Sequence, residues 1–281
     1  MYYIEAFIEN AIAEDIGDHD ITSFACIPDT AHGKAQLLVK QNGIIAGVEM
    51  ARKIFEIFDK ELKMETFIQD GASVTVGDIV FIVEGKVLSI LQIERLVLNV
   101  MQRMSGVATK TAEYVERLKG LKTKILDTRK TTPGLRYLEK AAVKIGGGEN
   151  HRMGLYDMVM IKDNHIDFAG SIEQAIKATK DYLRRRSKDV MIEIEARNIQ
   201  DVKEILRVGG IDRIMLDNFS LENTREAVEL INGAYETEAS GGITLQTLRP
   251  YAECGVDFIS VGALTHEMKS LDLSLKAILF V

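Results

Sequence analysis

The sequence predicts an α/β protein in which a mixed α+β N-terminal part is followed by a longer part with alternating strands and helices. From about Lys122 onward, short apolar runs recur, and each is followed by a loop and an amphipathic helical pattern. A polar residue or a glycine stands at the end of each apolar run. Strands that are apolar on both faces and alternate with helices are typical of a parallel sheet, either wound open or closed as a barrel.

The N-terminal part, about the first hundred residues, mixes helical and strand patterns. Helical spacing of apolar residues predicts helices over Tyr2–Ile16 and Glu49–Phe58. Strands are predicted over Lys34–Lys40, Gly43–Ala46 and Asp78–Glu84, with turns at Asp18–Thr22, Asp70–Gly71 and Val76–Asp78. A long helical pattern covers Ser89–Leu118, and we expect the helix to break near Ser105 and Gly106.

The second part can be divided into strands and helices by the same patterns. The predicted strands are KTKILDT, DMVMIK, VMIEIE, DRIMLD, AYETEAS and DFISVG. The predicted helices between them are Ser171–Arg185, Ile199–Val208, Leu221–Asn232 and Leu245–Cys254. In a parallel barrel the carboxyl ends of all strands open onto one face, where active sites of this architecture lie. The polar residues that end these strands therefore predict a site at that face.

Composition narrows the class of protein. The 281 residues include 35 Lys and Arg against 42 Asp and Glu, a formal net charge of −7. Nonspecific nucleic-acid binding needs an excess of positive charge, so we expect no nucleic-acid partner. No apolar run approaches the roughly 18 to 20 residues that cross a bilayer, so we expect no membrane partner. The acidic N-terminal residues and the two cysteines, Cys26 and Cys254, predict a cytoplasmic protein without a disulfide framework.

Positive charge is concentrated in the middle of the chain, where residues 103–162 hold 13 Lys and Arg against 6 Asp and Glu. Five of these side chains, which we call the cation set, stand beside glycines and strand ends: Arg129, Lys130, His151, Arg152 and Lys162. Arg binds carboxylates or phosphates through paired hydrogen bonds, and Lys adds a mobile point charge. The set predicts a site for a small, multiply charged anion such as a dicarboxylate. The alternative is ion pairing with Asp127, Glu149 and Asp157.

Two carboxylates, Glu195 and Asp217, end neighbouring predicted strands. Next to a bound pyrophosphate they would hold Mg²⁺, a hard cation that takes one or two protein oxygens together with substrate phosphates. The competing interpretation is a salt bridge to Lys162 or Arg129. Glu193, two residues before Glu195, is expected on the same side of its strand at a different depth.

Glycine-containing loops follow the last two predicted strands. They comprise Ser240, Gly241 and Gly242 after one strand and Val261, Gly262 and Ala263 after the other. Barrel enzymes frequently bind a phosphate at these loops through backbone N–H groups. The alternative is that the glycines only form turns.

Several of these segments resemble those of the quinolinate phosphoribosyltransferase family. The segments are LNVMQRMSGVAT, DTRKTTPGLR, GGGENHRMGLYDMVMIKDNH, IMLDN, EASGGI and ISVGALTH. The resemblance runs nearly end to end and includes EDIGDHDIT, which is similar to an acidic segment of the family. Glu267 and the Gly209–Asp212 turn depart from the family pattern, and neither lies at a residue with an assigned role.

The resemblance implies an N-terminal mixed α+β domain over residues 1–107 and an incomplete α/β barrel of about seven strands over residues 108–267. It further implies that the tail, residues 268–281, packs on the N-terminal domain. The implied reaction transfers phosphoribosyl from phosphoribosyl pyrophosphate to quinolinate with loss of CO₂, giving nicotinate mononucleotide in de novo NAD biosynthesis. Mg²⁺ is the implied cofactor and a homodimer the implied assembly.

The resemblance also implies a role for each candidate residue. Arg129, His151, Arg152 and Lys162 hold the quinolinate carboxylates together with Arg103 of the neighbouring subunit, and Thr128 and Lys130 belong to the same substrate site. Glu195 and Asp217 bind the ribose hydroxyls and Mg²⁺, while Ser240, Gly241, Gly242, Val261, Gly262 and Ala263 bind phosphate. The implied catalytic residues are Lys130, Lys162, Glu195 and Asp217.

Three other functions stay open at this point. A molybdenum-linked paralogue of the same family would act on another small anionic acceptor, although the TRK, NHR and IKDN segments favour quinolinate. A lyase could form a Schiff base at Lys162, and borohydride trapping would reveal it. A protein without activity could keep the fold, which the joint presence of Lys162, Glu195 and Asp217 argues against.

Overall fold

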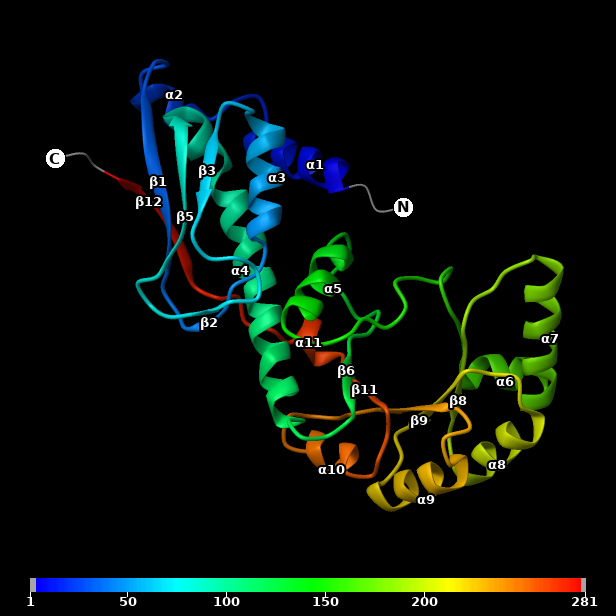
Figure 1. Cartoon of the computed structure of the whole chain (residues 1–281). Coiled ribbons are helices and arrows are strands. Elements are labelled where there is room, and N and C mark those ends of the chain that lie inside the picture. Colours follow the sequence, from blue (N-terminus) through cyan, green and yellow to red (C-terminus); the bar gives the residue numbers. More distant parts are fainter. Residues whose placement is uncertain (1–3, 279–281) are drawn as a thin grey trace. The chain divides into compact units, whose positions relative to one another are not determined.

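A computed structural model describes residues 4–278, which divide into two compact units (Figure 1). The first unit comprises the described chain up to Ala112, then Thr131–Gly147, then the described chain from Glu267. The second unit comprises Glu113–Lys130 and Gly148–His266. The chain therefore passes between the two units more than once.

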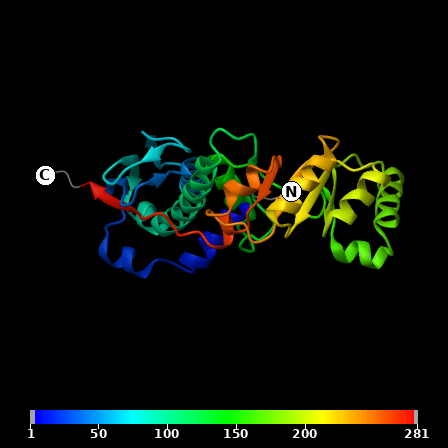
Figure 2. The ribbon, with the colours of Figure 1, turned by 90° about the horizontal axis from the view of Figure 1, so that it is seen from below.

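The first unit is built on a four-stranded antiparallel sheet in the order β12-β1-β5-β3. Its strands are β1 (His32–Val39), β3 (Lys63–Thr66), β5 (Ile79–Lys86) and β12 (Leu273–Ile278). The C-terminal strand β12, red in Figure 2, pairs with β1 so that Leu275 lies opposite Leu37. A separate pair, β2 (Gly43–Ile44) and β4 (Ser73–Val74), completes the strands described in this unit.

Five helices begin in the first unit. They are α1 (Ile4–Ile16), α2 (Ile21–Cys26), α3 (Val48–Phe58), α4 (Val87–Arg117) and α5 (Arg136–Ile145). Phe55 of α3 and Phe81 of β5 are buried and meet edge to face, with ring centroids 5.9 Å apart. The predicted start of α1 at Tyr2 lies outside the described residues. The predicted turn at Asp18–Thr22 leads into α2, because the Asp20 carboxylate accepts the Ser23 N–H and caps the helix.

The predicted break near Ser105 and Gly106 is wrong, since α4 runs unbroken through both residues. The Ser105 hydroxyl is buried and bonds to both the N–H and the carbonyl of Ala46. A Cβ on Gly106 would lie 2.3 Å from the carbonyl oxygen of Lys269. The small residues therefore let another segment approach the helix closely, and they do not end it.

Gly106→Ala tests this interpretation of the glycine. In an exposed helix the change would stabilise by about 1 kcal/mol. At Gly106 the added methyl meets backbone that cannot move aside easily, and overpacking of this kind costs roughly 1–3 kcal/mol. We therefore expect a lower free energy of unfolding in urea titrations. A variant more stable than the parent would show that Lys269 does not constrain this position.

The second unit is a parallel, barrel-like α/β sheet, as the sequence predicts. Its six strands pair in the order β6-β11-β10-β9-β8-β7. They are β6 (Lys124–Leu126), β7 (Val159–Ile161), β8 (Ile192–Ala196), β9 (Arg213–Asp217), β10 (Glu236–Ser240) and β11 (Phe258–Ser260). On the edge of β6 away from β11, Leu126 forms an isolated parallel bridge with Glu149. Glu149 thus stands where a seventh strand would lie.

Helices follow the strands as expected for βα units. They are α6 (Asp163–Ala169), α7 (Ile172–Arg185), α8 (Ile199–Val208), α9 (Leu221–Ile231), α10 (Leu248–Ala252) and α11 (Ala263–His266). Ser171, Asn198 and Ser220 cap α7, α8 and α9 by accepting a backbone N–H three residues on. The predicted helix from Leu245 begins later, because Thr244 and Thr247 form a hydrogen-bonded turn before α10.

Over residues 4–278, none of the helices combines the length and the apolar character needed to cross a membrane.

Candidate active site

The carboxyl ends of the parallel strands bring the predicted polar residues to one end of the second unit. Asp217 ends β9 and Ser240 ends β10, and the two residues are register partners. Glu195 lies one residue before the end of β8, opposite Met215. Lys162 follows β7 directly, and Val261 follows β11. Residues that end successive strands in the sequence therefore lie at the same end of the sheet, because the strands are parallel.

The loop that carries His151 and Arg152 is fixed by Asp127, the residue after β6. The buried Asp127 carboxylate accepts the His151 N–H at 2.9 Å and also the side-chain amide of Asn150. Glu149 pairs with Lys124 at 2.7 Å. Asp127 and Glu149, considered from the sequence as ion-pair partners of the cation set, thus have structural contacts that shape this loop.

Arg152 and Arg129 act on each other electrostatically. Arg152 is half-buried, and its Nη1 donates to the Met158 carbonyl at 3.4 Å. Burial lowers the pKa of Arg152, and the positive charge of Arg129 lowers it further. Two guanidinium groups that repel each other at the end of a barrel form a site to which an anion would be attracted.

Lys162 and Glu195 form an ion pair, with Nζ 3.1 Å from Oε2. Burial raises the pKa of Glu195, the Lys162 ammonium opposes this, and the nearby carboxylate of Asp217 raises it again. The Asp217 carboxylate accepts a hydrogen bond from the Asn218 amide at 2.8 Å. The predicted salt bridge between Glu195 and Lys162 is therefore present, and the carboxylate of Asp217 lies close enough to Glu195 to affect its pKa.

The two glycine loops approach other parts of the site closely. A Cβ on Gly241 would lie 2.2 Å from Oδ1 of Asn218, and Gly241 has a φ of +100°. A Cβ on Gly262 would lie 3.0 Å from the Lys130 side chain. The Thr265 hydroxyl donates to the Lys130 carbonyl at 2.7 Å, so the Lys130 backbone is fixed beside the second loop. Thr128 accepts the Lys130 N–H at 3.0 Å.

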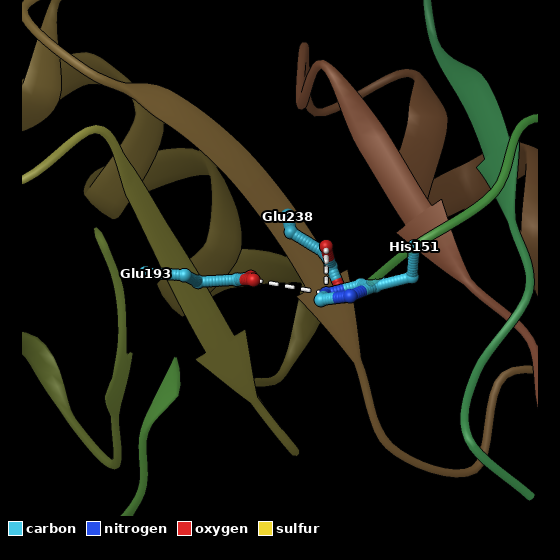
Figure 3. Close-up of side chains that lie close together, drawn as sticks. All are labelled: His151, Glu193 and Glu238. Atoms are coloured by element: carbon cyan, nitrogen blue, oxygen red, sulfur yellow. Dashed lines mark ion pairs between the residues drawn. The ribbon is translucent and has the colours of Figure 1, made fainter. Parts of the chain in front are cut away.

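A buried cluster of charged side chains lies inside the same sheet (Figure 3). Nε2 of His151 is 2.9 Å from Oε2 of Glu193 and 3.5 Å from Oε2 of Glu238. Arg213 contacts Glu238 at 3.3 Å and lies over the Phe258 ring at 4.1 Å. Glu193 was expected on this side of its strand from the sequence, whereas Glu238 and Arg213 were not predicted. The alternation of side chains along a strand could have indicated both residues. Glu238 lies two positions before Ser240, and Arg213 lies four positions before Asp217, so each points to the same side of its strand as that site residue.

The charges in this cluster shift one another's protonation. Burial opposes the charged form of His151, but the hydrogen bonds and charges of Glu193 and Glu238 outweigh it and raise the pKa of His151 to about 9. Burial and the charge of Glu238 raise the pKa of Glu193 to about 7, against the opposing effects of His151 and Arg213. The Arg152 N–H lies 2.7 Å from Nδ1 of His151 and donates to it when Nδ1 carries no proton.

Arg103 belongs to the first unit, unlike the rest of the candidate site. The buried Glu139 carboxylate accepts hydrogen bonds from its Nε and Nη2, and the Thr132 hydroxyl accepts a further one from Nη2 at 2.6 Å. Among residues 4–278, no hydrogen-bond partner is found for Nη1. The guanidinium is thus held on one edge, while its other edge is left for a further acceptor.

The fold and the site together define an α/β-barrel-like enzyme with a cluster of charged side chains at the carboxyl ends of its parallel strands. Family models for the quinolinate phosphoribosyl transferase N-terminal domain and C-terminal domain match residues 20–105 and 107–276. The chain belongs to the quinolinate phosphoribosyltransferase family.

Curated relatives and solved structures agree with the family models. The chain is 47% identical, over 98% of its length and 83% of the relative's, to the Arabidopsis thaliana chloroplastic nicotinate-nucleotide pyrophosphorylase (carboxylating). It is 45% identical, over 98% of its length and 82% of the relative's, to the mitochondrial quinolinate phosphoribosyltransferase (decarboxylating) 2a of Nicotiana tabacum. The structure of NadC from Streptococcus pyogenes superposes with a TM-score of 0.93 at 38% identity, covering 98% of this chain and 97% of that one.

The names of these relatives correct the expectation of a cytoplasmic protein. Plant relatives 44–47% identical to the chain are described as chloroplastic or mitochondrial. The composition could not decide the compartment, because few cysteines and the lack of a long apolar run are compatible with any reducing aqueous compartment. Organelle addresses are carried by separate targeting peptides and not by the fold.

Proposed function

We propose that the chain transfers the phosphoribosyl group of phosphoribosyl pyrophosphate to quinolinate, with release of pyrophosphate and CO₂, to give nicotinate mononucleotide. The observation that carries the proposal is the grouping of Arg129, Arg152 and Lys162 with Glu195 and Asp217 at the strand ends of one unit. The reaction needs two sets of contacts. Positively charged side chains bind the diacid, and carboxylates bind the ribose and a metal ion.

In this proposal Arg129, Arg152 and Lys162 hold the two carboxylates of quinolinate, whereas His151 is buried against Glu193 and Glu238. Arg129 and Arg152 repel each other in the free protein, so a bound dianion relieves that repulsion as well as forming hydrogen bonds. Lys162 adds a third charge and can leave Glu195 for the substrate, because an exposed ammonium exchanges partners at little cost. Lys130 and Thr128 line the same site, with the Lys130 backbone fixed by Thr265.

The acids of the site fit a magnesium ion. Glu195 and Asp217 offer hard carboxylate oxygens, and burial together with the charge of Asp217 raises the pKa of Glu195, so a divalent cation held by these acids would be stabilised. When bound, Mg²⁺ would supply positive charge that neutralises the departing pyrophosphate. The loops at Ser240–Gly242 and Val261–Ala263 would hold phosphate through backbone N–H groups.

The chemistry follows from how the two substrates are held. The pyridine nitrogen of quinolinate attacks C1 of the ribose as pyrophosphate departs, and C1 gains positive charge that the carboxylates of Glu195 and Asp217 offset. Fixed orientation of both reactants can contribute roughly 7–11 kcal/mol to this step. The ribosylated ring nitrogen is cationic, so the 2-carboxylate leaves as neutral CO₂ and the electron pair on the ring is stabilised before it takes up a proton.

Arg103 completes the site in this proposal from the neighbouring subunit of a homodimer. Its guanidinium is fixed by Glu139 and Thr132, and Nη1 is left to reach a substrate carboxylate. The division into an N-terminal domain over residues 1–107 and a barrel domain over 108–267, with residues 268–281 on the former, is part of the same proposal.

The direct test supplies the protein with quinolinate, phosphoribosyl pyrophosphate and Mg²⁺ and follows CO₂ and nicotinate mononucleotide. We expect both products in equal amounts. Chelation with EDTA should abolish turnover, and added Mg²⁺ should restore it, because the acids and the phosphates otherwise repel each other. No nicotinate mononucleotide in the presence of all three components would contradict the function. Turnover that survives EDTA would contradict the metal, and a borohydride-trapped adduct on Lys162 would favour a lyase.

A further inference from the structure

The cluster of His151, Glu193 and Glu238 joins three separate parts of the second unit, the Asp127-bound loop, β8 and β10 (Figure 3). The His151 side chain is 5% exposed, and both glutamate side chains are fully buried. Because the His151 ring has almost no contact with solvent, its interactions are set by the protein groups around it. Buried carboxylates without such partners would cost several kcal/mol each, so their placement beside His151 calls for a role.

A metal ion is one candidate, because the three side chains could each offer one ligand atom within 4.8 Å of the others. Arg213 argues against it. The Arg213 guanidinium already contacts Glu238 at 3.3 Å, so a divalent cation would have to lie beside a fixed positive charge. With Arg213 and a protonated His151, the two carboxylates are balanced without any ion.

The contacts of His151 connect this buried cluster to Arg152. Nε2 carries a hydrogen both in the neutral Nε2–H tautomer and in the imidazolium, so it presents positive charge density to the Glu193 carboxylate 2.9 Å away in either form. The backbone N–H of His151 donates a hydrogen bond to the Asp127 carboxylate. With a pKa of about 9 His151 is an imidazolium at neutral pH, so Nδ1 accepts the Arg152 N–H only after the ring has lost a proton. His151 is therefore fixed at its backbone and at its ring, and Arg152 is the next residue in the chain.

We propose that Glu193 is a positioning residue of the quinolinate site, which acts through its buried ion-pair contact with His151 and thereby fixes the backbone from which Arg152 reaches the substrate. Arg213, the register partner of Glu193 on β9, contacts Glu238 of β10 and places a positive charge between the two carboxylates. The inference deepens the proposed function and rests on it. Partners that orient a ligand-binding group from behind typically contribute 10- to 100-fold to affinity or activity.

Glu193→Gln is the variant that tests this inference, since it keeps the size of the side chain and removes its charge. We expect the KM for quinolinate to rise about tenfold, while the KM for phosphoribosyl pyrophosphate stays within about twofold. Glu193→Asp retains a carboxylate, and its KM for quinolinate should lie between those of the parent protein and Glu193→Gln. Glu236→Gln is the matched control, because the half-exposed Glu236 contacts the same Arg213 from the solvent side. It should leave both KM values unchanged.

A second measurement does not depend on turnover. The chain has five histidines, so ¹⁵N-labelled imidazoles give five ring systems, and a His151→Asn variant identifies the signals of His151. In the parent protein we expect Nε2 to carry a proton throughout pH 6–8. In Glu193→Gln the amide can itself donate to Nε2, so the His151 ring signals should move, whereas in Glu236→Gln they should not.

Unchanged quinolinate KM in folded Glu193→Gln, or unchanged His151 signals, would overturn the inference. An equal rise in both KM values would overturn it too, since that indicates general damage. Should Glu193→Gln not fold, Glu193→Asp is judged by the same criteria. If the parent enzyme makes no nicotinate mononucleotide, the proposed function fails, and the ring signals still decide whether Glu193 holds His151.

Discussion

Replacing Arg152 with alanine is expected to lower kcat/KM for quinolinate at least about a hundredfold, which corresponds to roughly 3 kcal/mol of lost transition-state stabilisation. Arg152 is half-buried on a loop that Asp127 fixes, so its guanidinium is already in place before a substrate arrives. A guanidinium that is already in place loses little conformational entropy when the substrate binds. A water molecule in its position would not supply the lost positive charge.

The fold should survive this change. Arg129 and Arg152 repel each other in the free protein, so Arg152→Ala is expected to leave the melting temperature unchanged or slightly higher. Arg197→Ala is a suitable control, because Arg197 pairs with Asp167 and Asp201 on the helices. The control should keep full activity. Near-normal turnover of quinolinate by Arg152→Ala would contradict the assignment of the carboxylate site.

Mixing two inactive variants is expected to restore activity if the site is shared across a dimer. Arg103→Ala and Arg129→Ala should each be inactive alone. In a mixed dimer one site combines an intact Arg129 with an intact Arg103 from the partner, while the other site lacks both. Random exchange of subunits would then restore about a quarter of the parental activity, since half of the dimers are mixed and half of their sites are intact.

The control for this experiment mixes Arg129→Ala with Arg152→Ala. Both residues belong to the same unit of one chain, so every site in their mixed dimers keeps one defect and no activity should return. Subunit exchange can be verified with two affinity tags. Absence of rescue in verified mixed dimers of the Arg103 and Arg129 variants would count against a site shared between subunits.

Much of the fold could be predicted because the apolar patterns are local. The six strands of the barrel-like sheet and helices such as α8 and α7 lie where periodicity places them. Features that depend on distant residues were not predictable. Gly106 looks like a helix breaker in the sequence, and only the approach of Lys269 reveals why a glycine is needed inside a helix. Likewise, nothing in the local pattern shows that Glu149 bridges to Leu126 while its neighbours form no strand.

The candidate site was predictable as far as strand ends could locate it. Glu195, Asp217 and Lys162 meet because parallel strands align their carboxyl ends. The buried contacts of His151 were not foreseen, since the sequence offered no reason to pair a histidine after Gly148 with acids on β8 and β10. Which charged residues interact depends on their distance in the folded structure, and the sequence pattern alone does not show that distance.

The route of the chain between the two units limits how the protein can be divided. Lys130 and Gly148 belong to the second unit, whereas Thr131–Gly147 between them belongs to the first, as does the stretch from Glu267 on. No single cleavage can therefore yield two self-sufficient halves. A fragment starting near residue 108 would separate the buried Glu139 of α5 from its partner Arg103 in α4. It would also leave β1 without β12. We infer that synthesis must reach the last strand before the first unit can settle, so late truncation should harm the N-terminal sheet and not only the tail.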